Sequence, residues 1–392
     1  MNKQMKVYLD NSATSKMDEE VLKEMLPYFT EKYGNPSSLH SFGKEARDAL
    51  NHSREKFAKF LNCRAEEIYF CSGGTESDNL AIKGIAYAMK KQNKNHIITS
   101  PIEHSAVLNT CRQLEQEGFK LTILNVDNEG FIDLKQLENS ITEKTALVTI
   151  MFANSEIGTI QDIKKITNIC HKKKTIFHTD AVQTFAKIPV DIKKLDIDSL
   201  SIASHKFHGP KGVGLLYVKK NIPIESIVQG GGHEKGLRSG TEDISGIVGM
   251  TKAADIALKN LGKNYNYMAK LRDRLINELS KIENSRLNGS KGEKRLPNNV
   301  NFSFSGVEGE ALIMLLDMKG VAASAGSACS NILKGESHKA SHVLEAIKCP
   351  ENFINSPLRL TLSRFNTEEE IDYAVSAIKE SVSNLRKISP FK

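Results

Sequence analysis

The sequence predicts an α/β protein with a large domain, built on a mainly parallel sheet flanked by helices, and a small α+β domain. The chain has 392 residues, more than one small core usually organises. From about residue 65 to 220, short β-rich runs alternate with helical patterns, an order typical of β-α-β units. A long helical pattern after Thr241 then leads into mixed elements. We expect the large domain at residues 15–260 and the small domain at residues 1–14 and 261–392.

Apolar runs and helical patterns follow one another through the expected large domain. The predicted strands are IYFCSG at 68–73, HIITSP at 96–101, LVTIMFAN at 147–154, TIFHTDA at 175–181, DSLSIAS at 198–204 and GVGLLYV at 212–218. The predicted helices between the first four strands are residues 75–91, 104–118 and 160–174. In such sheets ligands lie beyond the carboxyl ends of the strands. We therefore expect the site near Gly73, Asn154, Asp180 and His205.

The small domain is predicted from a second set of patterns. Helical patterns at 246–261 and 268–282 cross into it. Two strands and three helices are then expected, the strands at 300–306 and 359–365 and the helices at 310–320, 341–348 and 368–387.

Composition narrows the class of function. The net charge of +7 comes from 54 basic and 47 acidic residues that are interleaved along the chain, which favours a solvated surface over a nucleic-acid-binding face. No run of eighteen apolar residues and no leader-like start occurs, so we expect a cytoplasmic protein that does not bind membranes. The six cysteines form no C-x-x-C pair and no zinc-ligand spacing, which predicts reduced thiols and no intrinsic metal site.

Lys206 ends a buried strand pattern, in SHKFHGPKGVG. Desolvation at a sheet rim lowers the pKa of a lysine amine and suits it for covalent attachment to an aldehyde cofactor. Asp180 ends another apolar strand, and Gln183 follows three residues later. A carboxylate against a pyridine nitrogen makes the ring an electron sink, and a glutamine can bond to a ring hydroxyl. A single strand-end lysine is more often solvated, and a single aspartate is more often a helix cap. The hypothesis of an aldehyde cofactor with a pyridine ring therefore rests on Lys206, Asp180 and Gln183 together.

Two further segments contain residues that could bind a ligand or react. SGGTES at 72–77 follows a strand and opens a helix, so the N–H groups of Gly74 and Thr75 and the Thr75 hydroxyl could bind a phosphate, although the same residues also make an ordinary turn and N-cap. Cys329 lies among small residues in VAASAGSACSN. A structural cysteine prefers apolar surroundings, so this setting predicts a reactive thiol.

Ten segments, in order, resemble the class V, fold-type I pyridoxal-phosphate (PLP) enzymes, and among them the cysteine desulfurases of the NifS/IscS type. They are YLDNSAT, YGNPSSLHSFG, FCSGGTESDN, IEHSAV, ANSEIGTIQDI, HTDAVQ, HKFHGPKGVG, RSGTED, SAGSAC and RLTLSRF. They span nearly the whole chain. The resemblance implies PLP as cofactor, L-cysteine as substrate, L-alanine as product, a persulfide on Cys329, and sulfur supply for iron–sulfur cluster assembly.

The resemblance also implies a role for each matching residue. Lys206, Cys329 and His104 would be catalytic, with His104 stacked on the ring. Arg359 would hold the substrate carboxylate with its bidentate fork, and Asn154 would contact both the ring hydroxyl and the substrate. The implied cofactor-binding residues are Gly74, Thr75, Asn154, Asp180, Gln183, Ser204, His205, Lys206 and Thr241.

Expected partners follow from the same resemblance. Thr241 would reach the cofactor phosphate of a second subunit, which implies a homodimer. An iron–sulfur scaffold protein or another acceptor would take the sulfur, and Cys329 could transiently ligate an iron–sulfur cluster. A selenocysteine lyase or aminotransferase of the same fold, a sulfur donor for tRNA thiolation, and a scaffold without cofactor remain alternatives. The chain departs from the family pattern at Ala203 and Ser204, at His233, and in the long loop after Cys329.

Overall fold

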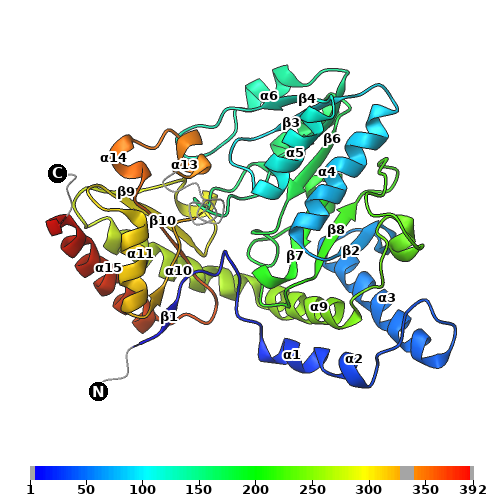
Figure 1. Ribbon diagram of the computed structural model, residues 1–392, viewed down its shortest axis with the longest axis horizontal. Helices are drawn as coiled ribbons and strands as arrows, with labels where there is room; N and C mark the ends of the chain where they lie inside the picture. The colour runs from blue at the N-terminus through cyan, green and yellow to red at the C-terminus, as the bar shows by residue number, and fades with distance from the viewer. Residues whose placement is uncertain (1–4, 327–339, 389–392) are drawn as a thin grey trace.

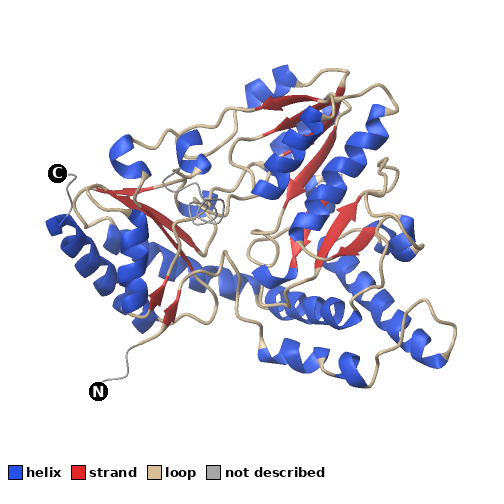
Figure 2. Ribbon diagram, viewed as in Figure 1, coloured by secondary structure: helices blue, strands red, loops and turns tan. Residues whose placement is uncertain are grey.

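The computed structural model describes residues 5–326 and 340–388. Figures 1 and 2 show a sheet with helices on both faces on one side of the molecule and a smaller sheet packed with helices on the other. In the described residues the larger sheet has seven strands in the order β2-β8-β7-β6-β5-β3-β4, and β8 alone runs antiparallel to the rest. The predicted mainly parallel α/β fold is thus confirmed.

The strands of this sheet include all six predicted runs and one more. They are β2 (Ile68–Cys71), β3 (His96–Thr99), β4 (Lys120–Ile123), β5 (Thr145–Thr149), β6 (Ile176–Asp180), β7 (Ser199–Ala203) and β8 (Gly214–Val218). The additional strand, β4, lies at the sheet edge with both of its end residues exposed. It lacks the continuous apolar run that marks a buried parallel strand.

Helices cover both faces because successive strand residues point to opposite sides. On β5, Val148 packs into the core formed with α3 (Ser41–Leu61), α7 (Ile163–Lys172) and α9 (Ile244–Lys259), whereas Leu147 packs with α4 (Gly74–Lys90) and α5 (Ser105–Gln116). The remaining helices on this side are α1 (Glu19–Met25), α2 (Pro27–Thr30), α6 (Leu134–Ser140) and α8 (Ile192–Leu195).

The second sheet is antiparallel, in the order β12-β10-β9. Its strands are β9 (Ser285–Leu287), β10 (Asn299–Phe304) and β12 (Pro357–Thr361), packed with α10 (Leu261–Leu279), α11 (Gly309–Met318) and α15 (Glu368–Ile388). Near the N-terminus, β1 (Val7–Tyr8) pairs in parallel with β11 (Val321–Ala322), and Val7 and Leu9 join this core. On this basis we propose the division into residues 15–260 and residues 1–14 with 261–392.

A small apolar cluster joins the two parts beside the carboxyl ends of the parallel strands. Val343, Leu344 and Ile347 of α13 (His342–Ala346) and of its C-cap pack against Ile102 and Met151, from the loops after β3 and β5. The short helix α14 (Glu351–Ile354) follows α13. This packing places α13 at the edge where the site is expected.

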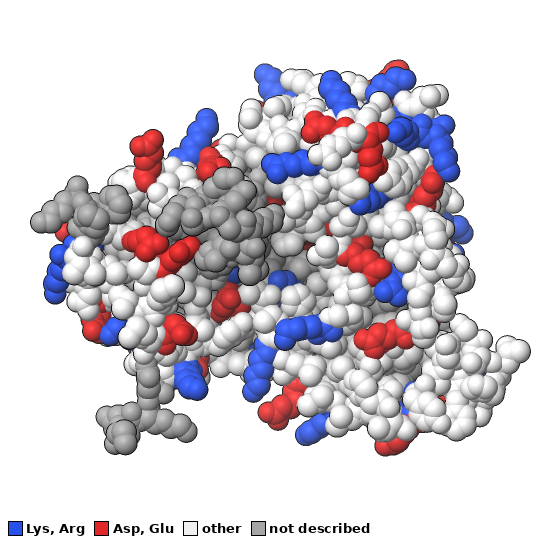
Figure 3. Space-filling model, viewed as in Figure 1, with Lys and Arg blue, Asp and Glu red and all other residues white. Residues whose placement is uncertain are grey.

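The described residues show a mixed surface charge and unpaired cysteines. On the face shown in Figure 3, basic and acidic side chains are interspersed. The five cysteines within the described ranges are unpaired. No helix among these residues is both long and apolar enough to cross a bilayer, and none of their His, Cys, Asp and Glu side chains form a group of three that could bind a metal ion.

Candidate active site

A cavity of about 420 Å³ lies at the carboxyl ends of the parallel strands and is also lined by Arg359 of β12 and His342 of α13. This volume is in the range of small-molecule sites. Most of the predicted site residues line it, namely Gly74, Thr75, His104, Asn154, Asp180, Gln183, His205, Lys206 and Arg359. Ser204 and Thr241 do not line it, and Cys329 lies outside the described residues.

Lys206 enters the cavity from the turn after β7. Its Nζ donates to the carbonyl oxygens of Ser12, at 2.6 Å, and Ala13, at 2.9 Å. Burial, reinforced by the Arg359 guanidinium, lowers the pKa of the Lys206 amine to about 8. The amine is therefore far easier to deprotonate near neutral pH than a solvated lysine.

Asp180 ends β6 and faces the same cavity. Its Oδ1 accepts a hydrogen bond from the Val182 N–H at 2.8 Å. Burial raises the pKa of Asp180, while His104 and Lys206 favour its charged form. Asp78 is also buried, and burial together with the charge of Asp180 raises its pKa, so two carboxyl groups with raised pKa line the cavity.

The orientation of the Gln183 amide is fixed by its neighbours. Its Oε1 accepts from Lys187 Nζ at 3.0 Å, and its Nε2 donates to the Ser12 carbonyl at 3.1 Å. Lys187 is buried, and burial lowers its amine pKa to about 7. No feature of the sequence pointed to Lys187, because its role depends on a contact made inside the fold.

His104 caps the N-terminus of α5. Its Nδ1 accepts from the Ala106 N–H at 3.1 Å, and burial lowers the pKa of the ring. The histidine is therefore neutral at pH 7, with its proton on Nε2.

Asn154 lines the cavity, but its amide bonds to the surrounding backbone. Its Nδ2 donates to the Ile102 carbonyl at 2.8 Å, and its Oδ1 accepts from the N–H groups of Glu156 and Ile157 at 2.8 and 2.9 Å. These bonds shape the loop after β5. A contact of Asn154 with the cofactor stays a prediction.

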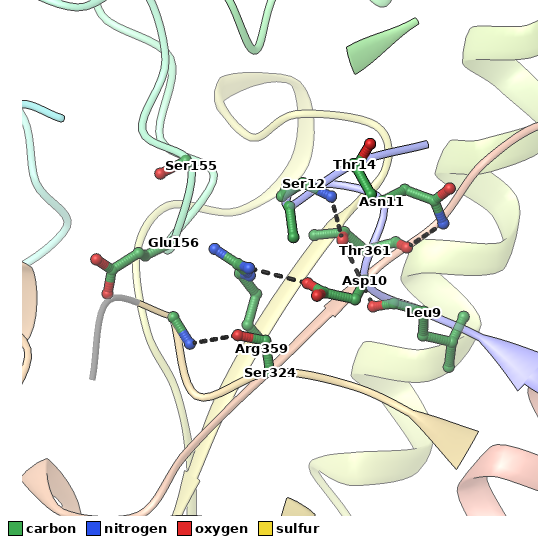
Figure 4. Close-up of polar contacts among 12 residues, drawn as sticks. Leu9, Asp10, Asn11, Ser12, Thr14, Ser155, Glu156, Ser324, Arg359 and Thr361 are labelled. Atoms are coloured by element: carbon green, nitrogen blue, oxygen red, sulfur yellow. Dashed lines mark hydrogen bonds and ion pairs between the residues drawn. The ribbon is translucent and has the colours of Figure 1, made fainter. Parts of the chain in front are cut away.

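Arg359 reaches the cavity from β12, a strand of the small domain. Its Nη2 donates to Asp10 Oδ1 at 2.9 Å, as the close-up in Figure 4 shows. Its buried Nε has no hydrogen-bond partner in the described part of the chain. In Figure 4 the guanidinium lies between Asp10 and Glu156, and Arg359 is one of the residues that line the cavity.

The departures from the family pattern have structural consequences. Ala203 lines the cavity, whereas Ser204 is fully buried, and a Cβ on Gly209 would lie 2.0 Å from its Oγ. Adjacent residues at a strand end point in different directions, so the hydroxyl is carried away from the cavity. His233 Nδ1 accepts from the Gly240 N–H at 3.3 Å, next to the exposed Thr241.

Several polar residues in or beside the cavity were not predicted. Asp10, which accepts a hydrogen bond from Arg359 but does not itself line the cavity, and Glu156, which does line it, stand in the matched segments YLDNSAT and ANSEIG, and their acidic character was the available signal. His342 lines the cavity at the start of α13. Its only sequence context is a helix start, which gave no indication of function.

Comparison with known proteins covers nearly the whole chain. Residues 7–374 match the model of the family described as Aminotransferase class-V. A protein named "Cysteine desulfurase IscS" from Clostridium botulinum (strain Kyoto / Type A2) is 50% identical over 392 residues, which is 100% of this chain and 97% of that protein. A solved structure titled "NIFS-LIKE PROTEIN" aligns with a TM-score of 0.90 at 42% identity, covering 97% of this chain and 100% of that one. Another, "SspA in complex with cysteine", aligns with a TM-score of 0.80 at 35% identity, covering 92% and 100%.

Proposed function

The chain belongs to the class-V aminotransferase family and, within it, to the PLP-dependent cysteine desulfurases, and we propose that it converts L-cysteine to L-alanine through a persulfide on Cys329. One observation carries most of the argument. Lys206, with its lowered pKa, and the buried Asp180 face one cavity that is also lined by Arg359.

The residues of the cavity fit PLP. Lys206 would attach to the aldehyde, Asp180 would bond to the ring nitrogen, and Gln183 would lie at the ring hydroxyl. Gly74 and Thr75 open α4, whose N-terminal N–H groups and dipole favour a phosphate. When bound, PLP supplies a protonated ring that accepts electrons released at the substrate α-carbon.

Arg359 is suited to bind the substrate carboxylate. Asp10 occupies only one of its nitrogens, Nη2, so the guanidinium that lines the cavity keeps donor capacity for a charge-assisted bond with the substrate. Fixing the carboxylate at Arg359 would direct the α C–H bond of L-cysteine toward Lys206 Nζ, which removes the proton. A lysine pKa of about 8 suits that transfer near neutral pH.

Sulfur transfer then requires a nucleophile, and we assign that role to Cys329. Its thiolate attacks the substrate sulfur, so an S–S bond forms as the C–S bond breaks. The electron pair of the C–S bond stays on carbon, which takes up a proton to become the methyl group of alanine. His104, with N–H at Nε2, can donate a hydrogen bond within the cavity during these steps.

Two variants test this proposal. Lys206→Ala should abolish formation of both alanine and sulfide from L-cysteine and remove the yellow colour of bound PLP. Cys329→Ser should keep the colour and lose sulfur transfer, while the matched Cys63→Ser, at a half-buried thiol on the large domain, should keep both. A Cys329→Ser enzyme with full desulfurase turnover would refute the persulfide step, and keto-acid formation instead of alanine would indicate an aminotransferase.

We also propose a cellular role, a location and an oligomeric state for the protein. Relatives named IscS support a role in supplying sulfur for iron–sulfur cluster assembly, with a scaffold protein as acceptor and Cys329 as a transient cluster ligand. We place the protein in the cytoplasm, where unpaired cysteines are the rule. We also propose a homodimer in which Thr241 contributes to the cofactor site of the partner subunit.

A further inference from the structure

His342 is a second histidine of the cavity that contains Lys206, Arg359 and His104. It is half-buried and opens α13, on the side of the small domain. We propose that His342 Nδ1 is the proton acceptor for the thiol of L-cysteine during sulfur transfer. The inference rests on the desulfurase function proposed above and assigns a further catalytic residue to it.

One hydrogen bond fixes the tautomer of His342. Its Nε2 lies 3.1 Å from the backbone carbonyl oxygen of Glu103. A carbonyl oxygen can only accept, so Nε2 must carry the hydrogen, and in the neutral ring Nδ1 then has a lone pair. No group in the described ranges donates to that nitrogen. His342, which lines the cavity, therefore has one ring nitrogen that can accept a proton.

His104 offers the opposite function. Its Nδ1 is occupied by the Ala106 N–H, so Nε2 carries the hydrogen and can only donate. Accepting a proton at Nδ1 would break the bond that caps α5. Of the two histidines, His342 alone can take a proton and keep its backbone hydrogen bond.

The position of the His342 ring is set by rigid surroundings. The preceding residue, Ser341, caps α13 by accepting from the Val343 N–H and donates to Glu156 Oε2 at 2.6 Å. Val343 and Leu344 are fully buried against the loops that carry His104 and Asn154. A general base fixed in this way does not have to be ordered when the substrate enters.

The reaction releases the S–H proton of L-cysteine, and a base is needed to accept it. A cysteine thiol has a pKa of about 8.5, so the substrate sulfur is mostly protonated at neutral pH. As the thiolate of Cys329 bonds to that sulfur, the S–H proton passes to His342 Nδ1 and the transferred sulfur becomes the terminal atom of a persulfide anion. The electron pair of the broken C–S bond remains on carbon, and the imidazolium returns the same proton there. Alanine forms, His342 is neutral again, and no other reactant is consumed.

The electrostatic setting of His342 comes from several elements. The other charged and titratable side chains that line the same cavity are Asp78, Glu103, His104, Glu156, Asp180, His205, Lys206 and Arg359. This set contains both positive and negative groups, so a variant that tests His342 must leave all of them in place.

His342→Gln is the direct test. Glutamine can still donate an N–H to the Glu103 carbonyl but has no basic nitrogen. In single turnovers with enzyme in excess, we expect alanine formation to slow about 10²-fold and added imidazole to restore part of the rate. PLP absorption should be unchanged, and His52→Gln, at an exposed position of α3, should behave as the parent protein. A His342→Gln enzyme with the parent rate would overturn the assignment.

A measurement on the unmodified protein is independent of turnover. Nitrogen-15 NMR of histidine-labelled protein, with the His342 signals identified by their loss in His342→Gln, should show Nε2 protonated and Nδ1 unprotonated in the neutral ring. A hydrogen on Nδ1 would overturn the proposal even if the desulfurase reaction is confirmed. Conversely, failure of the parent protein to form alanine from L-cysteine would refute the proposed function itself, whatever the tautomer.

Discussion

At the scale of single residues, the pair of Asp10 and Arg359 connects the N-terminal segment to the proposed substrate carboxylate site. Asp10→Ala would leave the guanidinium without its fixed partner and allow it other rotamers. Since one charge-assisted hydrogen bond is worth about 1.5–3 kcal/mol, we expect KM for L-cysteine to rise at least about tenfold, with a smaller change in kcat. Steady-state kinetics across cysteine concentrations measures both.

Two variants control this prediction. Asp10→Asn keeps an acceptor oxygen and should raise KM less than Asp10→Ala. Asp18→Asn alters a similar ion pair, with Arg364, that does not line the cavity, and should leave KM unchanged. Equal KM values for Asp10→Ala and the parent would show that Arg359 does not need Asp10.

The burial of Glu103 predicts how the free energy of unfolding depends on pH. Burial raises its pKa to about 8, whereas a glutamate in an unfolded chain titrates near 4.3. Between about pH 4.3 and 8 the folded protein therefore binds more protons than the unfolded chain, and the free energy of unfolding falls as pH rises. Glu103→Gln should flatten this dependence, as measured by urea unfolding across the interval. Glu345→Gln, exposed on α13, should retain the parent slope, and an equal slope for Glu103→Gln would contradict the argument.

At the scale of elements, a buried ion pair joins α3 to the loop before α9. Arg54 donates to both carboxylate oxygens of Glu234, at 2.9 and 2.6 Å, and Glu234 also accepts from the Phe70 N–H of β2. The two side chains are 10% and 1% exposed. Arg54→Met would leave a buried carboxylate unpaired, so equilibrium denaturation should show a loss of about 3–5 kcal/mol.

A second substitution separates the pair from simple packing. Adding Glu234→Gln to Arg54→Met removes the unpaired charge and should recover part of the loss. Arg64→Met breaks an exposed pair with Glu66 and should cost less than about 1 kcal/mol. A similar cost for Arg54→Met and Arg64→Met would mean that burial of the first pair is unimportant.

Elements buried on both faces were predictable from the sequence, and elements defined by tertiary contacts were not. β5 and β6 were visible as apolar runs because helices cover both of their faces. β4 escaped prediction as a short edge strand, and β1 and β11 are only two residues each. Their formation depends on the partner strand more than on local pattern.

The site shows the same limit. Lys206 and Asp180 could be placed at strand ends because the carboxyl edge of a parallel sheet is a general site position. The direction of Ser204 could not be predicted, since the chain turns into a short 3₁₀ helix at that residue. His342 reaches the cavity only because α13 packs against the loops after β3 and β5.

At the scale of the whole molecule, the first helices present an apolar surface. Large side chains from α1 to the start of α3 are 49–96% exposed, namely Leu26, Phe29, Tyr33, Leu39 and Phe42. Exposed apolar groups gathered in one region mark association surfaces. They support the proposed homodimer, which sedimentation at several protein concentrations can measure.

Thr241 allows a sharper test of the dimer. It lies outside the cavity of its own chain and is exposed next to Gly240, so within one subunit it cannot serve the role that the family resemblance assigns to it. In a hybrid of Lys206→Ala and Thr241→Ala subunits, one site would combine an intact Lys206 with an intact Thr241 from the partner subunit. After subunit exchange at equal amounts, about half of the dimers are hybrids with one such site in two, so about one quarter of the parent activity should appear above that of the separate variants. Activity equal to the mean of the two variants after confirmed exchange would place Thr241 outside the partner's site and make each subunit complete by itself.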